Sequence, residues 1–305
     1  MSIAKVLENY LKFMKKDKII ISICSKSFNN NLLLLLNSIS QNYIAFNLDI
    51  KVLITFNNVV KINNQNNKLI KKNLNKINYK VIYEKRIGIS YVRNRALKFL
   101  KTLKFDYCCF LDDDCKIRKN FIINHLKFIE KYNCSIVGGP QFYKSNKHFF
   151  RVLERNYNQG KDVFWVSTNN VFFKKSVLKH NLFFSENVAK YGFGEDQLFF
   201  SKLSKFGEKI KWNNNAVFEI VQKNRENFAW FINRNYKYGL TGILIDRELY
   251  GYIFAFLINV LKASLNLIKS LLYLLLIPIK PINNFYQSSA FFFRFIGRLL
   301  NIFKF

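Results

Sequence analysis

The stretch FDYCCFLDDD, residues 105–114, ends an apolar run with three consecutive carboxylates. An uninterrupted apolar run is typical of a strand that is covered on both faces of a sheet. The chain holds 19 acidic residues against 49 basic ones, so three neighbouring carboxylates that repel one another require an explanation. Either they lie in a solvated turn beside the basic residues of 116–119, or they bind a cation.

Apolar runs and helical stretches alternate on both sides of this segment. Strands are expected at 18–24, 50–56, 79–84 and 134–140, and helices at 32–41, 88–103 and 120–132. This alternation predicts an α/β fold with a mostly parallel central sheet flanked by helices on both faces. Ligands of such sheets bind beyond the carboxyl ends of the strands, which is where the three carboxylates lie.

The pattern is less regular after residue 163 and changes again toward the end of the chain. We expect a strand, a polar turn and a strand within 164–175, then a helix before the YGFGED loop and another helix that ends near Gly207. Two strands are expected within 208–221 and a helix over 227–238. We divide the chain into an N-terminal helix over 1–17, an α/β domain over 18–245 and a hydrophobic segment over 246–305.

The formal net charge of +30 fits nucleic acid, anionic lipid or a phosphorylated substrate as a partner. The excess is mostly Lys, in a chain also rich in Asn, Ile and Phe, and these residues share A/T-rich codons. Genome composition therefore explains much of the charge. No zinc finger, aromatic RNA-binding motif or basic region with heptads is present. We expect no nucleic-acid partner; a basic nucleic-acid binder remains an alternative and would show strongly salt-dependent affinity.

The cysteine usage predicts reduced, buried thiols in a cytosolic setting. The five cysteines are odd in number, have no C-x-x-C spacing and lie partly in expected strands. A zinc site formed by Cys109, Cys115 and His125 is an alternative, but its spacing matches no standard ligand pattern.

The three aspartates form a D-x-D pattern at a strand end. In an extended chain Asp112 and Asp114 point to one side and Asp113 to the other. Mg²⁺ or Mn²⁺ is typically held by one or two carboxylates together with substrate phosphates, which such a pattern provides. The alternative is a solvated acidic turn that pairs with the nearby lysines and arginine.

Three further segments carry candidate functional residues. In RIGISYVRNRA, residues 86–96, a glycine opens a helix and Arg93 offers a planar fork to a phosphate or a base. In GFGEDQLFF, residues 192–200, one of two acids is a general base or else a simple helix cap. In EIVQKNRENFAWFINRNYKYG, residues 219–239, Arg225 could neutralise a diphosphate, or the aromatic residues could simply pack a core.

In order and spacing these segments together resemble the family 2 glycosyltransferases with a GT-A fold. The resemblance runs from about Lys18 to Gly239 and includes IIISICSKSFN, RIGISYVRNRA, FLDDD, STNNVFFKKSVL, YGFGEDQLFFSKLSKFG and an R…W…R…Y..G tail. It looks closest to bacterial members that build surface polysaccharide or lipopolysaccharide, including the succinoglycan-type glucosyltransferases. The resemblance implies inverting transfer from a nucleotide-sugar, with a UDP-sugar favoured, to a glycan or a lipid-linked acceptor.

The resemblance also implies how the donor is held. Asp112 and Asp113 would meet the nucleotide and its ribose, and Asp114 with Asp112 would bind a divalent cation, Mn²⁺ or Mg²⁺. Arg93 would contact the nucleotide, and Arg225 would lie near the diphosphate.

On the acceptor side, the resemblance implies that Asp196 is the catalytic base and that Glu195 lies beside it. Two departures from the family pattern concern the donor. The first strand ends in CSKSFN and keeps only the aromatic-Asn end, Phe28 and Asn29. After the second strand, TFNNV has Asn57 or Asn58 where the family normally has an Asp that reads the base, so we assign Asn57 to the donor site.

Two other classes of protein stay open. A non-catalytic glycosyltransferase-like scaffold would explain the changed TFNNV segment, although the intact DDD and GED motifs argue against it. A sugar-nucleotide nucleotidyltransferase has a similar sheet, but the glycine-rich phosphate loop after the first strand is missing.

The last quarter of the chain is apolar with a polar stripe. Residues 252–279 are interrupted by Lys262 and Lys269, which share one helical face with Asn259, Asn266 and Tyr273. This pattern predicts amphipathic helices that lie on an anionic membrane surface, at the cytoplasmic face of the inner (plasma) membrane, as a peripheral or monotopic attachment. The alternatives are a helical pair that caps the α/β domain, or one short span near 270–279.

Overall fold

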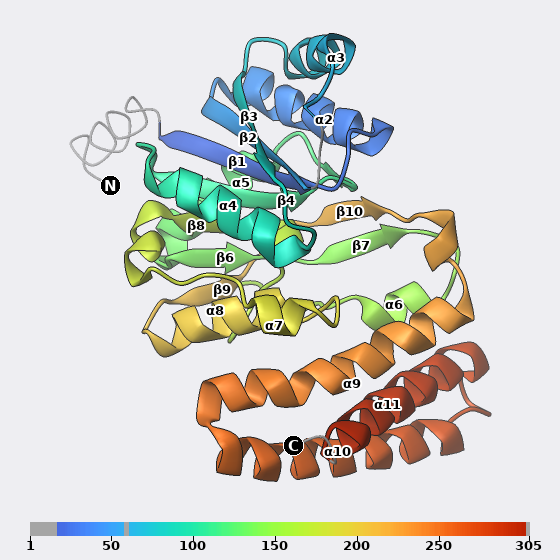
Figure 1. Ribbon diagram of the computed structural model, residues 1–305. Coiled ribbons are helices and arrows are strands. Elements are labelled where there is room, and N and C mark those ends of the chain that lie inside the picture. The colour runs from blue at the N-terminus through green and yellow to red at the C-terminus, as the bar shows by residue number, and fades with distance from the viewer. Residues whose placement is uncertain (1–16, 58–60, 303–305) are drawn as a thin grey trace, which may run out of the picture.

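The structure is a computed structural model that describes residues 17–57 and 61–302. The helix expected over 1–17 therefore lies outside the described residues, apart from residue 17. The described chain forms two sheets with helices on both faces and a layer of three long helices (Figure 1).

The central sheet has seven strands in the order β3-β2-β1-β4-β8-β6-β9. Their bounds are β1 (Lys18–Ser25), β2 (Asp49–Asn57), β3 (Asn78–Glu84), β4 (Tyr107–Asp112), β6 (Ile136–Gly138), β8 (Val171–Lys174) and β9 (Ile210–Trp212). β8 runs antiparallel to both of its neighbours, β4 and β6, and the other pairs are parallel. The prediction of a mostly parallel α/β sheet is confirmed.

A second, three-stranded sheet has the order β5-β10-β7. Its strands are β5 (Cys115–Ile117), β10 (Val217–Ile220) and β7 (Gln141–Lys144). Asp113 and Asp114 form the turn between β4 of the first sheet and β5 of the second. The predicted alternation of the three aspartates is therefore wrong, because the extended conformation ends at Asp112.

The two faces of the central sheet bury separate cores. Along β1, Ile19, Ile21 and Ile23 join one core, whereas Ile20 and Cys24 join the other. The first core is covered by α2 (Asn30–Phe46), α3 (Asn64–Leu74) and α5 (Phe121–Tyr132), and the second by α4 (Ile89–Lys101) and α8 (Glu195–Lys205). The strand is thus covered on both faces, as its continuous apolar run predicts.

The region 149–225 contains five short helical elements, whereas the sequence pattern predicted one helix between the strand that ends at 175 and the YGFGED loop. These are α6 (Phe149–Leu153), η1 (Thr168–Asn170), η2 (Lys175–His180), α7 (Glu186–Ala189) and η3 (Lys223–Arg225). The strand expected at the start of 164–175 does not form, and η1 precedes β8 there. Asn170 explains the turn, because its side chain donates to the carbonyl oxygens of Pro140 and Asn215 at 3.0 and 2.9 Å.

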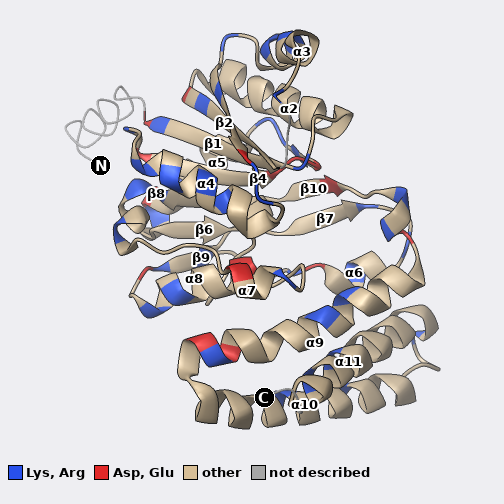
Figure 2. Cartoon of the chain, viewed as in Figure 1, with Lys and Arg blue, Asp and Glu red and all other residues tan. Residues whose placement is uncertain are grey.

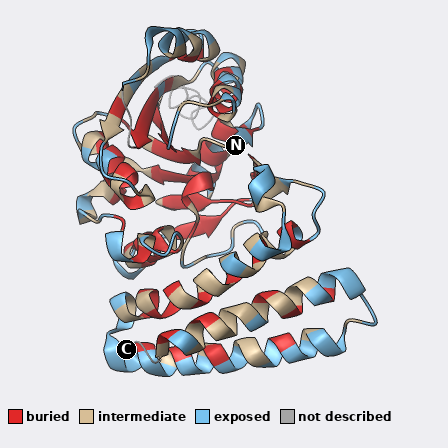
Figure 3. Ribbon diagram, turned by 45° about the vertical axis from the view of Figure 1, so that its right-hand side comes forward, coloured by how far each residue is buried: buried red, intermediate tan, exposed pale blue. Residues whose placement is uncertain are grey.

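Three long helices close the chain: α9 (Phe228–Tyr250), α10 (Tyr252–Leu275) and α11 (Pro281–Ile302). They form one layer beside the α/β part of the molecule (Figures 1 and 3). α9 joins this layer to α8 through Ile245 and Leu198, and to α6 through Phe231 and Phe149. The boundary predicted between 245 and 246 lies inside α9, and the division of the chain into domains stays a prediction.

The polar stripe of α10 contacts the other two helices through Asn259 and Lys262, whereas Lys269 of the same stripe is exposed. Asn259 is buried and accepts a hydrogen bond from Arg298 of α11 at 2.7 Å, and Lys262 lies 2.7 Å from the buried Asp246 of α9. The opposite face is apolar and exposed, and includes Ile253 at 77% and Leu275 at 76% exposure. α10 is long and apolar enough to cross a membrane, and it is the one such helix in the described part of the chain.

Candidate active site

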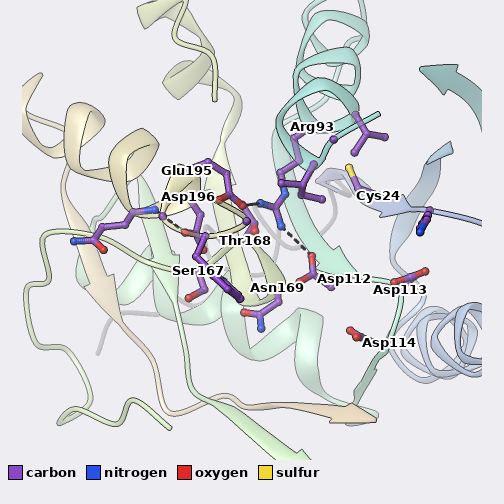
Figure 4. Close-up of a pocket in the computed structure, with 18 of the residues that line it drawn as sticks. Cys24, Arg93, Asp112, Asp113, Asp114, Ser167, Thr168, Asn169, Glu195 and Asp196 are labelled. Carbon is purple, nitrogen blue, oxygen red and sulfur yellow. Dashed lines mark hydrogen bonds and ion pairs between the residues drawn. The ribbon is translucent and has the colours of Figure 1, made fainter. Parts of the chain in front are cut away.

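The carboxyl ends of β1, β2 and β4 border a cavity of about 510 Å³ (Figure 4). Every residue that the sequence singled out as a site residue lines this cavity: Asn57, Arg93, Asp112, Asp113, Asp114, Glu195, Asp196 and Arg225. The fold thus brings together five segments that are far apart in the chain. We call this space the active-site cavity.

Arg93 connects the two acidic motifs across the cavity. Its Nη1 lies 2.6 Å from Oε1 of Glu195, and its Nη2 lies 3.3 Å from Oδ1 of Asp112 (Figure 4). The side chains of Arg93 and Glu195 are both buried. Burial opposes a charge on Arg93, but the carboxylates of Asp112 and Glu195 outweigh it and raise the pKa of the guanidinium.

Each of the three aspartates has a different partner. Asp112 pairs with Arg93, as described above. Asp113 accepts hydrogen bonds from Ser25 Oγ at 2.5 Å and Asn29 Nδ2 at 3.0 Å, and Asn29 in turn caps α2 by accepting from the backbone N–H of Leu32. Asp113 therefore fixes the loop after β1, where the CSKSFN departure lies.

Asp114 belongs to a group of acids at the edge of the second sheet. Arg225 lies between Glu219 and Asp114, with its Nη1 3.2 Å from Glu219 Oε1 and 3.6 Å from Asp114 Oδ2. Burial and the negative charge of Glu219, with smaller contributions from the two neighbouring aspartates, raise the pKa of Asp114 to about 8. Arg225, with Arg234 also acting on Glu219, supplies fewer positive charges than Asp112, Asp113, Asp114 and Glu219 supply negative ones.

The oxygen donors of this group fit a hard divalent cation such as Mg²⁺ or Mn²⁺. Within residues 17–57 and 61–302, no set of three or more His, Cys, Asp and Glu side chains converges closely enough to hold a metal alone. Phosphate oxygens of a substrate would therefore have to complete the coordination, as is usual for Mg²⁺. Cys109, Cys115 and His125, considered above for zinc, are buried but form no metal-holding group among the described residues, and all five cysteines are free.

The two acids of the GFGED segment have different surroundings. Gly194 precedes α8 with φ +96°, a left-handed conformation in which glycine is not strained, and this turn sets Glu195 and Asp196 in the first turn of α8. Glu195 is tied to Arg93, whereas Asp196 has no cation within ion-pairing distance among the described residues. Asp196 accepts from the backbone N–H of Gln197 at 2.7 Å, and burial raises the pKa of its carboxyl.

The side chain of Asn57 braces the loop between β3 and α4. Its amide donates to the carbonyl oxygens of Glu84 and Arg86 at 3.4 and 2.6 Å, and its Oδ1 accepts from the N–H of Gly88 at 3.0 Å. Its assignment as a base-reading residue stays a prediction. Asn58, the other residue considered for this role, lies outside the described residues.

The cavity also contains residues that sequence reasoning did not assign. These are Glu219 and Gln141 from the second sheet, Arg234 and Tyr238 from α9, and Trp165 with 167–169 from the segment before β8. A carboxylate inside an otherwise apolar strand, VFEI, was a signal for Glu219, because such a charge is rarely buried without a partner. Glu219 is hydrogen-bonded to Gln141 and paired with Arg225.

A family model described as glycosyl transferase family 2 matches residues 18–190, more than half of the chain. A search of curated proteins finds no match. Among solved structures, the mannosyltransferase PcManGT from Pyrobaculum calidifontis, in complex with GDP-Man and Mn²⁺, is similar with a TM-score of 0.59 at 13% identity. That match covers 99% of this chain and 94% of that one.

The S. aureus protein TarS is similar as well. Its fragment 1–349 in complex with UDP-GlcNAc gives a TM-score of 0.55 at 16% identity and covers 77% of this chain and 67% of that one. A further structure of the fragment has a TM-score of 0.53 at 17% identity, with 77% of this chain and 66% of that chain covered. At these identities the likeness shows a shared fold, which is the GT-A fold expected from the motifs.

Proposed function

The chain belongs to glycosyl transferase family 2, and from that premise we propose that it is an inverting, nucleotide-sugar-dependent hexosyltransferase. It would move a sugar from a nucleoside-diphosphate donor to a glycan or lipid-linked acceptor in cell-surface polysaccharide synthesis. A succinoglycan-type specificity stays a prediction.

One observation carries this proposal: a single cavity holds the acidic turn after β4 and the GFGED segment, with Arg93 bound to both. A transferase needs the donor diphosphate and the acceptor hydroxyl within bonding distance of one sugar carbon. At one side of the cavity, the carboxylates beside Arg225 have too few positive charges around them and can hold a cation together with the diphosphate. At the other side, Asp196 has no ion-pair partner among the described residues and can act on the acceptor hydroxyl. A non-catalytic scaffold has no need of this arrangement.

The difference between Glu195 and Asp196 supports the assignment of the base. Burial raises the pKa of both carboxyls, but Glu195 is held by Arg93, whereas Asp196 has no cation within ion-pairing distance among the described residues. A carboxylate with a raised pKa is a stronger base, so Asp196 would take the proton from the acceptor hydroxyl. The hydroxyl oxygen bonds to the anomeric carbon from the opposite face, the bond to the diphosphate oxygen breaks, and that oxygen keeps the electron pair.

The acidic turn and Arg225 would hold the diphosphate. We assign Asp114 and Asp112 to a divalent cation, Mn²⁺ or Mg²⁺, which when bound offsets the negative charge of the leaving diphosphate. Arg225 lies beside Asp114 and is one-third exposed, so it can exchange a carboxylate for a phosphate oxygen. Asp113 and Asn57 would shape the nucleotide site through the loops that they brace.

The donor is proposed to be a UDP-sugar. The TarS fragment has been solved with UDP-GlcNAc and with UDP, whereas PcManGT has been solved with GDP-Man. Both proteins share the fold with this chain at low identity, so the proposal that the nucleobase of the donor is uracil rests on the motif resemblance. Product analysis by mass spectrometry with a panel of nucleotide sugars would identify the donor.

The substitution Asp196→Asn tests the base assignment. Removal of a general base is expected to lower turnover by about 10²–10⁴-fold, while donor binding in the presence of the metal stays within a factor of about two. Asp162→Asn is the matched control, because Asp162 is exposed and pairs with Lys211 at 2.9 Å, outside the cavity. Near-normal turnover of Asp196→Asn would rule out the assignment.

We also propose that the outer face of α10 lies on the cytoplasmic face of the inner membrane, as a monotopic attachment. Its large exposed side chains, among them Ile253, Leu257, Leu261 and Ile268, form an apolar surface that water does not favour. Exchange of these four residues for Gln is expected to abolish binding to anionic vesicles and to leave the circular dichroism spectrum unchanged. A wild-type protein that is fully soluble without detergent and ignores such vesicles would contradict this proposal.

A further inference from the structure

A second cavity, of about 240 Å³, lies between the three C-terminal helices. It is lined by Tyr238 from α9, by Lys262, Leu265, Asn266 and Lys269 from α10, and by Arg294 and Arg298 from α11. We call it the basic cavity. The stripe of polar residues that the sequence showed on α10 thus forms one wall of an open, positively charged space.

The positive charges of the basic cavity are only partly neutralised. Asp246 of α9 is buried against it and binds Lys262 at 2.7 Å and Arg298 at 3.4 Å. Residues 252–302 contain no acidic residue, so α10 and α11 supply no further carboxylate. Four cations against one carboxylate leave a surplus of about three positive charges in a small space.

Arg294 and Lys269 carry two of these three surplus charges, and Lys262 and Arg298, which share Asp246, carry the third. No carboxylate lies within ion-pairing distance of Arg294 or Lys269 in the described part of the chain; Arg294 donates from Nε to Asn235 Oδ1 at 2.8 Å instead. Burial lowers the pKa of Arg294, and the neighbouring cations Arg234 and Arg298 lower it further against the opposing effect of Tyr238. A bound anion would relieve this repulsion.

The basic cavity opens beside the apolar face of α10. Leu265 both lines the cavity and is 44% exposed, and Lys269 is exposed at its edge. α10 contains no charged residue other than Lys262 and Lys269, and Figure 2 shows this helix mostly in the tan of uncharged residues. A ligand with an anionic head and an apolar chain can therefore place its head among the cations and its chain along the outer face.

Tyr238 links this cavity to the active site, because its side chain lines both spaces. Its hydroxyl accepts a hydrogen bond from Nε of Arg234, another residue of the active-site cavity, at 3.0 Å. A head group in the basic cavity would thus lie one side chain away from the active-site cavity.

We propose that the basic cavity binds the terminal phosphate or diphosphate of a membrane lipid whose hydrocarbon chain lies along the outer face of α10. The surplus of charge suits a phosphate that carries two negative charges better than a phosphodiester that carries one. This inference rests on the membrane attachment proposed above, but it does not depend on glycosyl transfer.

Vesicle flotation of the full chain tests the proposal. The vesicles contain phosphatidylcholine with either phosphatidic acid, which has a terminal phosphate, or phosphatidylserine, which has a phosphodiester, at equal surface charge. The wild type is expected to bind the phosphatidic acid vesicles several-fold more tightly. The double variant Lys269→Gln/Arg294→Gln is expected to lose about tenfold in affinity for phosphatidic acid and to lose the preference.

Two variants serve as controls. Lys280→Gln removes an exposed cation at the turn between α10 and α11, outside the basic cavity, and is expected to keep the preference. Lys269→Gln alone changes an exposed residue, so this variant is expected to fold. It allows the lipid preference to be tested even if Arg294→Gln destabilises the protein. Equal binding of both vesicle types by the wild type, or an equal loss of preference in Lys280→Gln, would overturn the proposal.

Two more arms separate the sources and the functions. Thermal stabilisation by inorganic phosphate or pyrophosphate as strong as that by phosphatidic acid would assign the cavity to a soluble anion and overturn the lipid assignment. Asp196→Asn is expected to bind vesicles like the wild type. If the wild type binds phosphatidic acid selectively but transfers no sugar, the proposed enzymatic function is refuted and the lipid-binding proposal stands. If the wild type transfers sugar but shows no lipid selectivity, the lipid-binding proposal is refuted and the enzymatic function stands.

Discussion

Arg93 lies between Glu195 and Asp112, with its two terminal nitrogens 2.6 and 3.3 Å from their carboxylate oxygens. The arginine is on α4, the aspartate ends β4, and the glutamate begins α8. Three elements from distant parts of the chain thus meet in one buried ion pair network. Its geometry sets the distance between the acidic turn and the GFGED segment.

Arg93→Met is expected to destabilise the protein by about 3–5 kcal/mol, because it leaves the buried Glu195 without its cation. The second change Glu195→Gln, made in the Arg93→Met background, removes the stranded charge and is expected to restore part of this loss. Chemical denaturation of the wild type, both single variants and the double variant measures the coupling energy. Strictly additive effects would show that the pair does not interact.

Removal of the divalent cation is expected to weaken donor binding. Calorimetric titration with UDP in the presence of Mn²⁺ should show a drop in affinity of about tenfold or more when a chelator is added. Asp114→Asn is expected to show the weaker affinity with or without chelator, because the substitution removes a proposed ligand. An affinity that changes with neither the chelator nor Asp114→Asn would exclude a metal role for this turn.

His125 is expected to make the fold sensitive to acid. It is buried between Phe121 and Phe172, and burial lowers its pKa from 6.5 to about 3. Below pH 6.5 the unfolded chain binds a proton that the folded chain does not, so the free energy of unfolding decreases as the pH falls. Between pH 7 and pH 5 this group alone accounts for about 2 kcal/mol.

His125→Phe removes the titrating ring and keeps an aromatic side chain in its place. Urea denaturation at pH 7 and pH 5 should show a smaller difference between the two pH values in the variant than in the wild type. The quantity compared is the difference in the free energy of unfolding between the two pH values. A change in packing that affects both pH values equally cancels in this difference. An unchanged difference would mean that other groups dominate the acid response.

Gly297→Ala is expected to push α11 away from α9. A Cβ at this position would overlap the carbonyl oxygen of Tyr236 and lie 3.0 Å from Cα of Gly239, so two backbones would have to separate. The cost is expected to be about 1–3 kcal/mol, measured as a lower midpoint of thermal unfolding. Ser289→Ala on the same helix is the control, because its hydroxyl makes an exposed hydrogen bond to the carbonyl oxygen of Phe285 in its own helix. Equal midpoints for the two variants would show that the contact is not tight.

The parallel strands and the place of the acidic turn could be predicted from the sequence. β1, β2 and β4 consist mostly of consecutive apolar residues. Such runs are typical of parallel strands that are buried on both faces of a sheet. The second sheet could not be predicted, since β5 and β7 have three and four residues and gain their order from pairing with β10, about 75 to 100 positions further along the chain.

The direction in which a polar stripe faces is likewise not encoded in its spacing. The stripe on α10 has the same period whether it meets water or a neighbouring helix, and here Asp246 of α9 decides the matter by providing a partner for Lys262. In the active-site cavity, the motifs located the acids, but the bonds that hold Asp113 and Asn57 come from loops that no pattern connects to them.

The burial of Asp246 also bears on how a detergent-free form of this enzyme is to be made. Ending the chain after α9 would take away Lys262 and Arg298, leaving a carboxylate stranded on the very helix that supports α8. Such a shortened protein is expected to misfold or precipitate. Replacement of the exposed leucines of α10 by polar residues, with all three helices retained, keeps the partners of Asp246 in place.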